Sequence, residues 1–204
     1  MRNNFLMVAL IFASFILLNM SIVHAKGDDA MQSVKGKKVV MIIASNNFRD
    51  EELLKPKEVL EKNGIVVTVA SSSLKEATGM LGAKVKPDVL FTNINTGNYD
   101  AVIFVGGSGA NEYWDNSTAH KIATDAHNSK KIVGAICIAP VTLARAGLLK
   151  DKKTTTYSST VSDIKSAGAN YTGADVERDG NIITASGPTA AQKFGEAIVK
   201  ALSR

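Results

Sequence analysis

The sequence has very little cysteine, proline or aromatic residue. Its 204 residues include 1 Cys and 4 Pro, and only 6% of them are aromatic. A single Cys excludes a disulfide scaffold and any metal site built on paired cysteines. With 16 Gly and 45% hydrophobic residues, the composition also excludes a collagen-like or disordered chain, and no repeat indicates a solenoid. These absences leave a globular protein with one thiol, Cys137.

Charge is nearly absent from the first 25 residues, where Arg2 precedes an apolar run over residues 5–18. Val23-His24-Ala25 is typical of a signal-peptidase site. We therefore interpret residues 1–25 as a signal peptide, 26–36 as a flexible leader and 37–204 as one domain, which predicts a periplasmic or secreted protein. The run is shorter than the ~20 residues of a membrane span, so no stable membrane insertion is expected after cleavage. An uncleaved N-terminal membrane anchor is the alternative.

The net charge of +5 is mildly basic. The lysines occur in small sets without interleaved aromatics, at Lys35, Lys37 and Lys38, at Lys130 and Lys131, and at Lys150, Lys152 and Lys153. A nucleic-acid groove would combine a basic patch with stacking side chains. We therefore expect solvated lysines and no nucleic-acid partner.

Short apolar runs alternate with helical patterns along the chain. Continuous apolarity is typical of strands buried on both faces, as in a parallel sheet covered by helices. The pattern predicts strands over 39–43, 65–69, 101–105 and 131–135, and helices over 51–63, 117–128, 140–146 and 189–202. Asp179-Gly180 between two further β-rich segments predicts an edge hairpin. We therefore predict an α/β sandwich with a mostly parallel sheet, an antiparallel edge, and a site at the carboxyl ends of the strands.

Cys137 lies where the fourth predicted strand ends, just before a helix with Pro140 in its first turn. Small residues two positions before and after it, Ala135 and Ala139, have the spacing of a nucleophile elbow. A helix N-terminus stabilises negative charge, so we expect thiolate to be favoured over thiol. The alternatives are a buried structural cysteine and an intermolecular disulfide, which a tight turn disfavours.

Two further loops follow predicted strands. Glu51 and Glu58 each have a lysine four residues on, whereas Glu52 has Pro56 there, so its carboxyl group is free to point towards Cys137. Beside a thiolate that group would stay protonated or carry a proton. The second loop, Gly106-Gly107-Ser108-Gly109, is neither a dinucleotide fingerprint nor a Walker motif. It could present the amide of Gly107 to an oxyanion, or form a tight turn without a catalytic role.

Taken together, the segment 44–53, the Gly-Gly-Ser-Gly loop and Ala-Ile-Cys-Ile-Ala-Pro over 135–140 resemble the DJ-1/ThiJ/PfpI superfamily. The resemblance implies a flavodoxin-like three-layer α/β sandwich (the class I glutamine amidotransferase-like fold), a homodimer and no cofactor. It also implies that Cys137 is a nucleophilic or redox-active thiol with Glu52 as its carboxyl partner. By the same resemblance, the amides of Gly107 and Ile138 would bind the oxyanion.

The sequence departs from the family pattern at two places. Peptidase-like members place His directly after the Cys, where this chain has Ile138, and other members place a His near Tyr157. Tyr157 can donate a hydrogen bond but is a poor base at neutral pH, so we expect an auxiliary role at most. His120 and His127 are expected to be surface or packing residues and are too few for a zinc site. Peptidase activity is therefore disfavoured.

The sequence thus favours an exported, cofactor-independent enzyme that acts on a small reactive carbonyl such as methylglyoxal. Cys137 would form a hemithioacetal in a glyoxalase- or deglycase-like reaction. The alternative is a non-catalytic oxidative-stress sensor or chaperone-like protein with an oxidisable Cys137. A third hypothesis is a structural domain whose thiol is unreactive.

Overall fold

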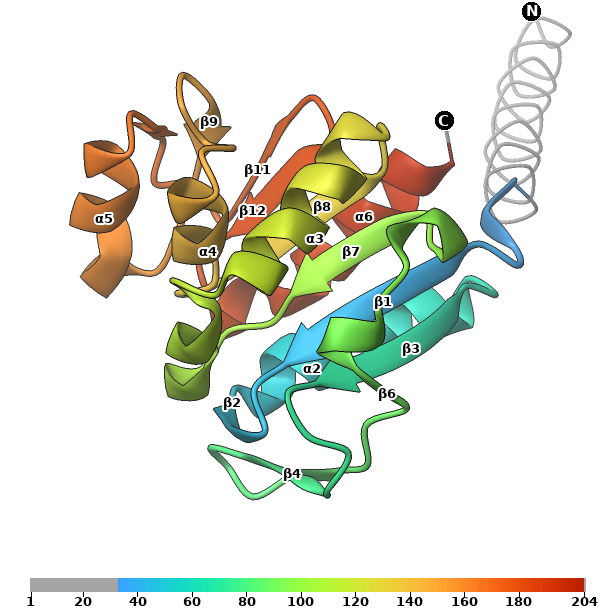
Figure 1. Ribbon diagram of the computed structural model, residues 1–204. Helices are drawn as coiled ribbons and strands as arrows, with labels where there is room; N and C mark the ends of the chain where they lie inside the picture. The colour runs from blue at the N-terminus through green and yellow to red at the C-terminus, as the bar shows by residue number, and fades with distance from the viewer. Residues whose placement is uncertain (1–32, 204) are drawn as a thin grey trace, which may run out of the picture.

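The computed structural model describes residues 33–203, in which a seven-stranded sheet lies between two layers of helices (Figure 1). From edge to edge its strands are β11 (Val176–Asp179), β12 (Ile182–Ala185), β8 (Ile132–Ile136), β7 (Ala101–Phe104), β1 (Lys38–Ile43), β3 (Val66–Ser71) and β6 (Val89–Leu90). Every neighbouring pair is parallel except β11 and β12. The predicted flavodoxin-like α/β sandwich with an antiparallel edge hairpin is therefore confirmed.

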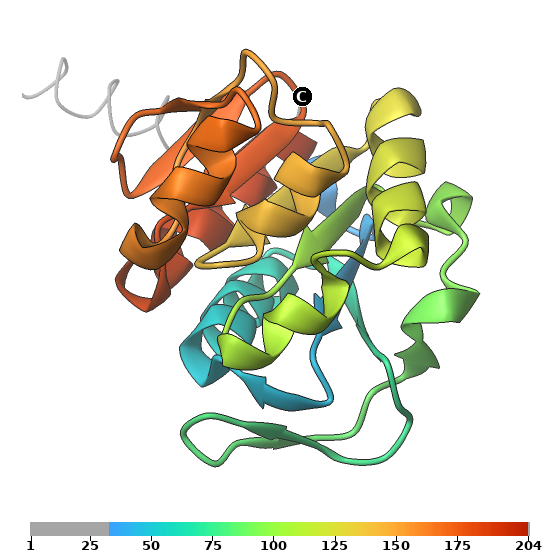
Figure 2. The ribbon, with the colours of Figure 1, turned by 60° about the vertical axis from the view of Figure 1, so that its left-hand side comes forward.

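The central strand β1 is buried on both faces, and its side chains alternate between two cores. One core lies against α2 (Asp50–Lys62) and α6 (Ala191–Leu202), and the other against α3 (Ser117–Asn128) and α4 (Pro140–Arg145). Figures 1 and 2 show these two pairs of helices on opposite sides of the sheet. Because successive side chains of a strand point to opposite faces, a continuous apolar run is what two covered faces require.

Gly134 in the middle of β8 allows α6 to pack closely on the sheet. A Cβ at this position would lie 2.6 Å from Ile103 Cδ1 and 3.0 Å from Phe194 Cζ. Phe194 of α6 is fully buried at this contact. The glycine thus makes room for the largest apolar side chain that α6 contributes to the core.

Smaller elements surround the main sheet. They are the strands β2 (Asn46–Phe48), β4 (Ala77–Gly79), β5 (Lys84–Val85), β9 (Lys153–Thr154) and β10 (Asn170–Tyr171), the helix α5 (Val161–Ser166), and the 3-10 turns Phe91–Asn93, Thr96–Asn98, Ser108–Tyr113, Ser158–Thr160 and Pro188–Ala190. The sequence did not predict α5. It has six residues, of which Ile164 is buried, so it shows no helical period.

The predicted element boundaries hold to within two residues, and the main differences lie at the ends of the domain. The last helix begins at Ala191 because residues 188–190 form a 3-10 turn after Gly187. Residues 1–25, the predicted signal peptide, and most of the predicted leader lie outside the described residues. The leader boundary needs correction, because Val34 is fully buried in the core and Gly36 donates to the Gly64 carbonyl at 2.8 Å.

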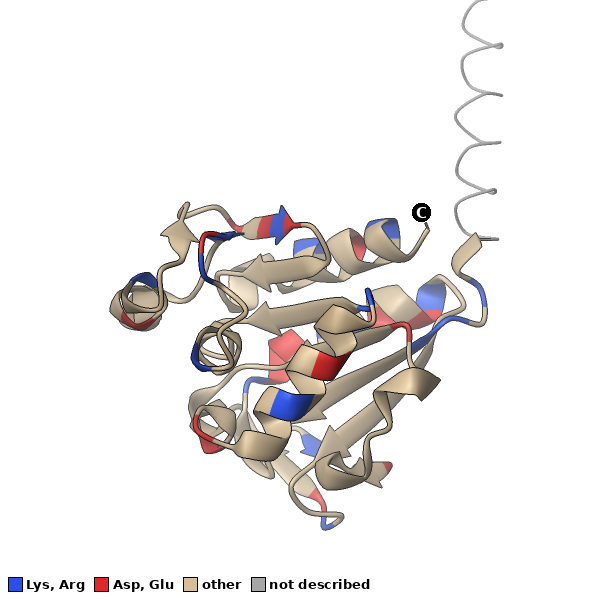
Figure 3. Ribbon diagram, turned by 45° about the horizontal axis from the view of Figure 1, so that its top comes forward, with Lys and Arg blue, Asp and Glu red and all other residues tan. Residues whose placement is uncertain are grey.

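Charged residues of both signs are interspersed along the helices and loops (Figure 3). Several form helical pairs four residues apart, such as Lys57 with Glu61 and Lys121 with Asp125. Exposed pairs of this kind contribute about 0.3–0.5 kcal/mol each. Over residues 33–203, no helix has the length and apolarity needed to cross a membrane.

Candidate active site

Three loops meet at the carboxyl ends of β1, β7 and β8, where the sequence predicts a site. They bring Glu52, Gly107 and Cys137 to one pocket of about 300 Å³. The pocket is lined by Arg49, Glu52, Met80, Gly107, Ser108, Cys137, Ile138, Tyr157, Ser159 and Pro188. The predicted thiol, carboxyl group and glycine loop therefore share one cavity, although 85 residues separate Glu52 from Cys137.

The backbone of Cys137 is held in an unusual conformation, with a φ of 64°. A non-glycine residue in this left-handed region is unfavourable by about 1–2 kcal/mol. Its N–H donates to the Ala185 carbonyl at 2.9 Å, and its own carbonyl accepts from Thr156 Oγ1 at 2.8 Å and from the Tyr157 N–H at 2.9 Å. Contacts from β12 and from the segment after β9 thus stabilise the predicted elbow.

The Cys137 side chain lines the pocket and is only 8% exposed. Burial, and secondly the negative charge of Glu52, raise the pKa of the Cys137 thiol to about 12, although the amides of Gly107 and Ile138 act in the opposite direction. Burial of the sulfur therefore opposes the expected thiolate at rest. The helix that follows, α4, has only six residues, and two amides do not replace the water that the sulfur has lost.

Glu52 lies in the first turn of α2 and is fully buried. Neither carboxyl oxygen has a partner at good hydrogen-bond geometry. Burial raises the pKa of Glu52 to about 8, while the neighbouring Cys137 thiol and the positive charge of Arg49 limit the rise. A carboxyl group in this state is mostly protonated at pH 7, which agrees with the predicted direction.

The adjacent carboxylate, Glu51, belongs to a different environment. Arg49 donates to it through Nε at 2.8 Å and through Nη2 at 3.1 Å, so Glu51 pairs with Arg49 rather than with the expected Lys55. This ion pair lowers the pKa of Glu51. Since the guanidinium group is engaged by Glu51, the buried Glu52 has no close ion-pair partner of its own.

The glycine loop is packed too closely for any side chain. A Cβ on Gly106 would overlap Glu52 Oε2 and would lie 2.6 Å from Cys137 Cβ. Gly107 has a φ of 97°, and a Cβ there would overlap the backbone of residues 47–49. The Gly107 amide lies close enough to lower the pKa of Cys137. These contacts explain why glycine is required at both positions, and they place the Gly107 amide beside the sulfur.

The predicted auxiliary residue Tyr157 also lines the pocket, together with several residues for which the sequence predicted no role. Tyr157 stands at its edge with 44% of its surface exposed, and Met80 is exposed to the same extent. Ser108 and Ser159 add hydroxyl groups to the lining. Ser108 could have been found from its place in the glycine loop. Met80 could not, because nothing in the local sequence indicates that it lies near Cys137.

Two histidines, His120 and His127, lie within the described residues. His120 Nε2 is 2.7 Å from the Trp114 carbonyl, and burial lowers the pKa of His127. Neither lines the pocket. Within residues 33–203, no group of three His, Cys, Asp or Glu side chains is arranged to hold a metal ion.

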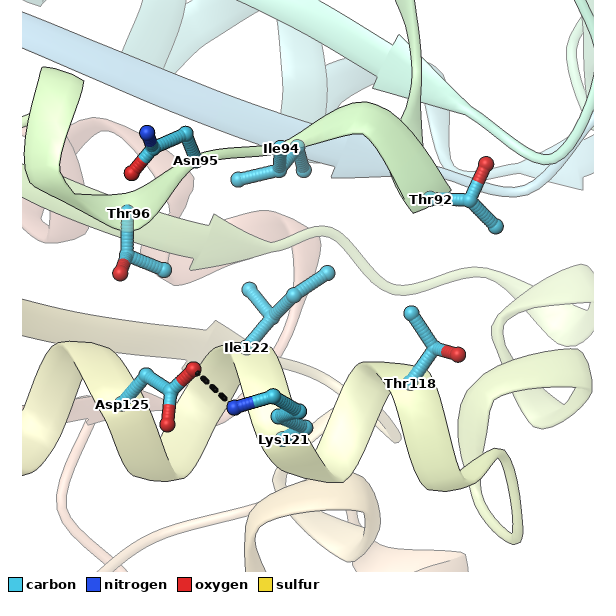
Figure 4. A pocket seen from close by; sticks show the side chains of 8 residues that line it. All are labelled: Thr92, Ile94, Asn95, Thr96, Thr118, Lys121, Ile122 and Asp125. Atoms are coloured by element: carbon cyan, nitrogen blue, oxygen red, sulfur yellow. Dashed lines mark hydrogen bonds and ion pairs between the residues drawn. The ribbon is translucent and has the colours of Figure 1, made fainter.

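A second cavity, of about 310 Å³, lies between α3 and the loop that contains the 3-10 turns at residues 91–98 (Figure 4). Ile94 and Ile122 form its apolar part, and Lys121 pairs with Asp125 along the helix at 2.8 Å. Its other lining residues are Thr92, Asn95, Thr96 and Thr118. Its lining contains neither a thiol nor an unpaired carboxylate, whereas the Cys137 pocket contains both.

Comparison with known proteins agrees with this geometry. The model of the DJ-1/PfpI family matches residues 37–201. An uncharacterized protein of Methanocaldococcus jannaschii is 39% identical over 93% of this chain and 96% of its own length, and a deglycase of Pyrococcus horikoshii is 32% identical over 80% and 98%. The crystal structure of a ThiJ/PfpI domain protein from Brachyspira murdochii has a TM-score of 0.80 and 33% identity, and covers 82% of this chain and 97% of that one.

Proposed function

Because the chain belongs to the DJ-1/PfpI family and has relatives named deglycases, we propose that it is an enzyme acting on small reactive carbonyl compounds such as methylglyoxal. The observation that carries the proposal is the pair formed by Cys137 and Glu52. A thiol and a fully buried, unpartnered carboxyl group adjoin each other in a pocket of about 300 Å³. Such a carboxyl group is unfavourable for stability, and strongly perturbed pairs of this kind cluster at functional sites.

The first step is addition of the thiol to the aldehyde carbon. Cys137 transfers its proton to the Glu52 carboxylate as the sulfur attacks, and a C–S bond replaces the π bond of the carbonyl. The carbonyl electron pair moves to oxygen, where the amides of Gly107 and Ile138 hold the negative charge. Glu52 then returns the proton to this oxygen, which gives a hemithioacetal.

In the second stage Glu52 removes the proton from the former aldehyde carbon and delivers it to the neighbouring carbon, while the hydroxyl proton of the hemithioacetal passes to the oxygen of the second carbonyl. The product is a thioester, which water hydrolyses to lactate and the free Cys137 thiol. The sum is one water added to methylglyoxal to form lactate, so the carbon oxidised and the carbon reduced are in the same molecule. No external oxidant, reductant or cofactor is required. Tyr157 lines the same pocket and would donate a hydrogen bond to the second carbonyl.

A methylglyoxal consumption assay with lactate detection tests this function. Wild type should convert methylglyoxal to lactate in equal amounts, and Cys137→Ser should lose turnover by at least 100-fold, within the range of a lost nucleophile. Ser108→Ala, which changes another pocket hydroxyl but no reacting group, is the matched control. Equal activity of wild type and Cys137→Ser would refute the proposed role of the thiol.

A second candidate function is sensing of oxidation through the same thiol. Among the described residues Cys137 has no second cysteine to resolve a sulfenic acid, so two peroxide molecules would yield a sulfinic acid and two waters. A protonated Glu52 would donate a hydrogen bond to it. Intact-mass spectrometry after graded peroxide should show a stable gain of two oxygens, and its absence in wild type would count against this function.

Export and self-association are part of the proposal. Cleavage after Ala25 would leave a periplasmic or secreted chain, and an intact mass of the cell-associated protein distinguishes it from an anchored one. The exposed apolar side chains of Leu54, Met80 and Leu81 support a homodimer. Light scattering should give twice the mass of the chain.

A further inference from the structure

We infer that Thr156 is a positioning residue, whose hydroxyl group holds the peptide bond between Cys137 and Ile138 so that the Ile138 amide faces the sulfur and the oxyanion. Thr156 lies 19 residues after Cys137 and is almost fully buried, with 1% of its surface exposed. The catalytic part of this inference, the orientation of an oxyanion amide, rests on the proposed function. Its direct consequence, the reactivity of the thiol, can be measured without any substrate.

The geometry of a peptide unit connects Thr156 to the sulfur. In a planar trans peptide the C=O and the N–H point in opposite directions. The Cys137 carbonyl is held on one side by Thr156 Oγ1 at 2.8 Å and by the Tyr157 N–H at 2.9 Å. The N–H on the other side of the same peptide is that of Ile138, and this amide stabilises the ionised sulfur. Fixing the carbonyl therefore fixes the amide.

The direction of the hydrogen bonds follows from counting protons. The carbonyl oxygen can only accept, so the single hydroxyl proton of Thr156 is directed to Cys137. Thr156 Oγ1 is also 2.7 Å from Thr160 Oγ1, so Thr160 donates in that bond, and it shares its single hydroxyl proton with the Tyr157 carbonyl at 3.1 Å. The resulting chain runs from Thr160 to Thr156 to the Cys137 carbonyl, and each bond polarises the next.

The neighbouring residue shows that this arrangement is specific. Thr155 is fully buried like Thr156, but its hydroxyl group has no hydrogen-bond partner. Valine has nearly the same shape as threonine, so Thr155→Val removes no side-chain hydrogen bond, whereas Thr156→Val removes the bond to the Cys137 carbonyl and the bond with Thr160. The two substitutions form a matched pair within one buried segment.

The elbow also needs such a restraint. Cys137 has a φ of 64°, a conformation that L-residues rarely adopt, and its peptide can relax by rotating when the carbonyl is released. Tyr157 contributes a backbone donor that no side-chain substitution removes. Loss of the Thr156 hydroxyl should therefore weaken the orientation of the amide without abolishing it.

The test is the pH dependence of Cys137 alkylation by iodoacetamide in wild type, Thr156→Val, Thr156→Ser and Thr155→Val. We expect Thr156→Val to alkylate about fivefold more slowly at pH 8, the effect of one lost hydrogen bond, and its profile to shift to higher pH. Thr156→Ser, which keeps the hydroxyl, and Thr155→Val should follow wild type. The charged groups around the sulfur, namely Glu52 with Glu51 and Arg49 beyond it, are the same in every variant.

Identical profiles for Thr156→Val and Thr155→Val would overturn the inference, because a purely structural role lowers the melting temperature without moving the profile. If Thr156→Val does not fold, Thr156→Ala, which also removes the hydroxyl group, takes its place, and a profile equal to that of wild type overturns the inference equally. Methylglyoxal turnover is measured separately. A wild type that alkylates as expected but consumes no methylglyoxal refutes the proposed function and leaves the role of Thr156 standing.

Discussion

The most direct test of the site is the substitution Glu52→Gln, which removes the titrating proton and keeps the size of the side chain. Folding raises the pKa of Glu52 from 4.5 to about 8, chiefly because the carboxyl group is buried. The unfolded chain therefore releases this proton at lower pH than the folded chain does. The contribution of Glu52 to the free energy of unfolding is therefore fully present below the pKa of the unfolded chain. It is lost as pH rises through the pKa of the folded chain.

The magnitude follows from this change in pKa. At 1.36 kcal/mol per pKa unit, the wild-type free energy of unfolding should fall by about 4 kcal/mol between pH 5 and pH 8.5 on account of Glu52. That is a large part of the 5–15 kcal/mol typical of a domain. Glu52→Gln has no such loss, so we expect its stability relative to wild type to grow by about 4 kcal/mol over the same range.

Urea denaturation at pH 5, 7 and 8.5, followed by the fluorescence of the single Trp, gives the two stability curves. Titrating groups whose pKa does not depend on Glu52, such as His127, are common to both proteins and cancel in the difference. Glu58→Gln is the control, because Lys62 lowers the pKa of this exposed carboxylate on the same helix and its substitution should keep the wild-type slope across this range. A difference between Glu52→Gln and wild type that does not change with pH would refute the assignment of a buried, protonated carboxyl group.

Three further predictions concern packing and catalysis. Gly106→Ala should lower the free energy of unfolding by about 1–3 kcal/mol through overpacking, and it should slow Cys137 alkylation. An unchanged melting temperature would contradict the close packing of Glu52 and Cys137 around this glycine. Phe194→Ala should lower the free energy of unfolding, measured by urea denaturation, by about 3–5 kcal/mol because the ring is fully buried against the sheet. A decrease of less than about 1 kcal/mol would contradict the role of this ring in the core. Methylglyoxal turnover should rise as pH passes about 8, since the carboxylate form of Glu52 accepts the thiol proton, and a rate that falls over that range would oppose this role.

Much of the fold could be predicted because its elements are locally encoded. The apolar run of β1 and the Asp179-Gly180 turn each indicate their structure within a few residues. The helix α5, at Val161–Ser166, was missed because it is too short to show a period. The packing of Val34 was missed because a single apolar residue in a polar segment has no pattern at all.

At the site, too, some features could be predicted from local sequence and others could not. The spacing around Cys137, the glycine loop and the position of Glu52 were visible in the sequence, since an elbow and a close backbone approach demand small residues nearby. The protonation state of the thiol was not, because burial raises the pKa of Cys137 and so opposes the expected thiolate. Desolvation depends on every atom that excludes water from the sulfur, and these atoms come from segments distant in the sequence.

The chain order thus encodes the layered α/β architecture and the identity of the thiol, because hydrophobic periodicity and steric demands at turns act over short stretches. Folding in three dimensions sets the chemistry of that thiol. It buries Glu52 beside the sulfur without an ion partner, and it brings the Thr156 hydroxyl to the Cys137 carbonyl from 19 residues away. Charge stabilisation and hydrogen-bond direction are properties of that assembled environment, and no local pattern of residues specifies them.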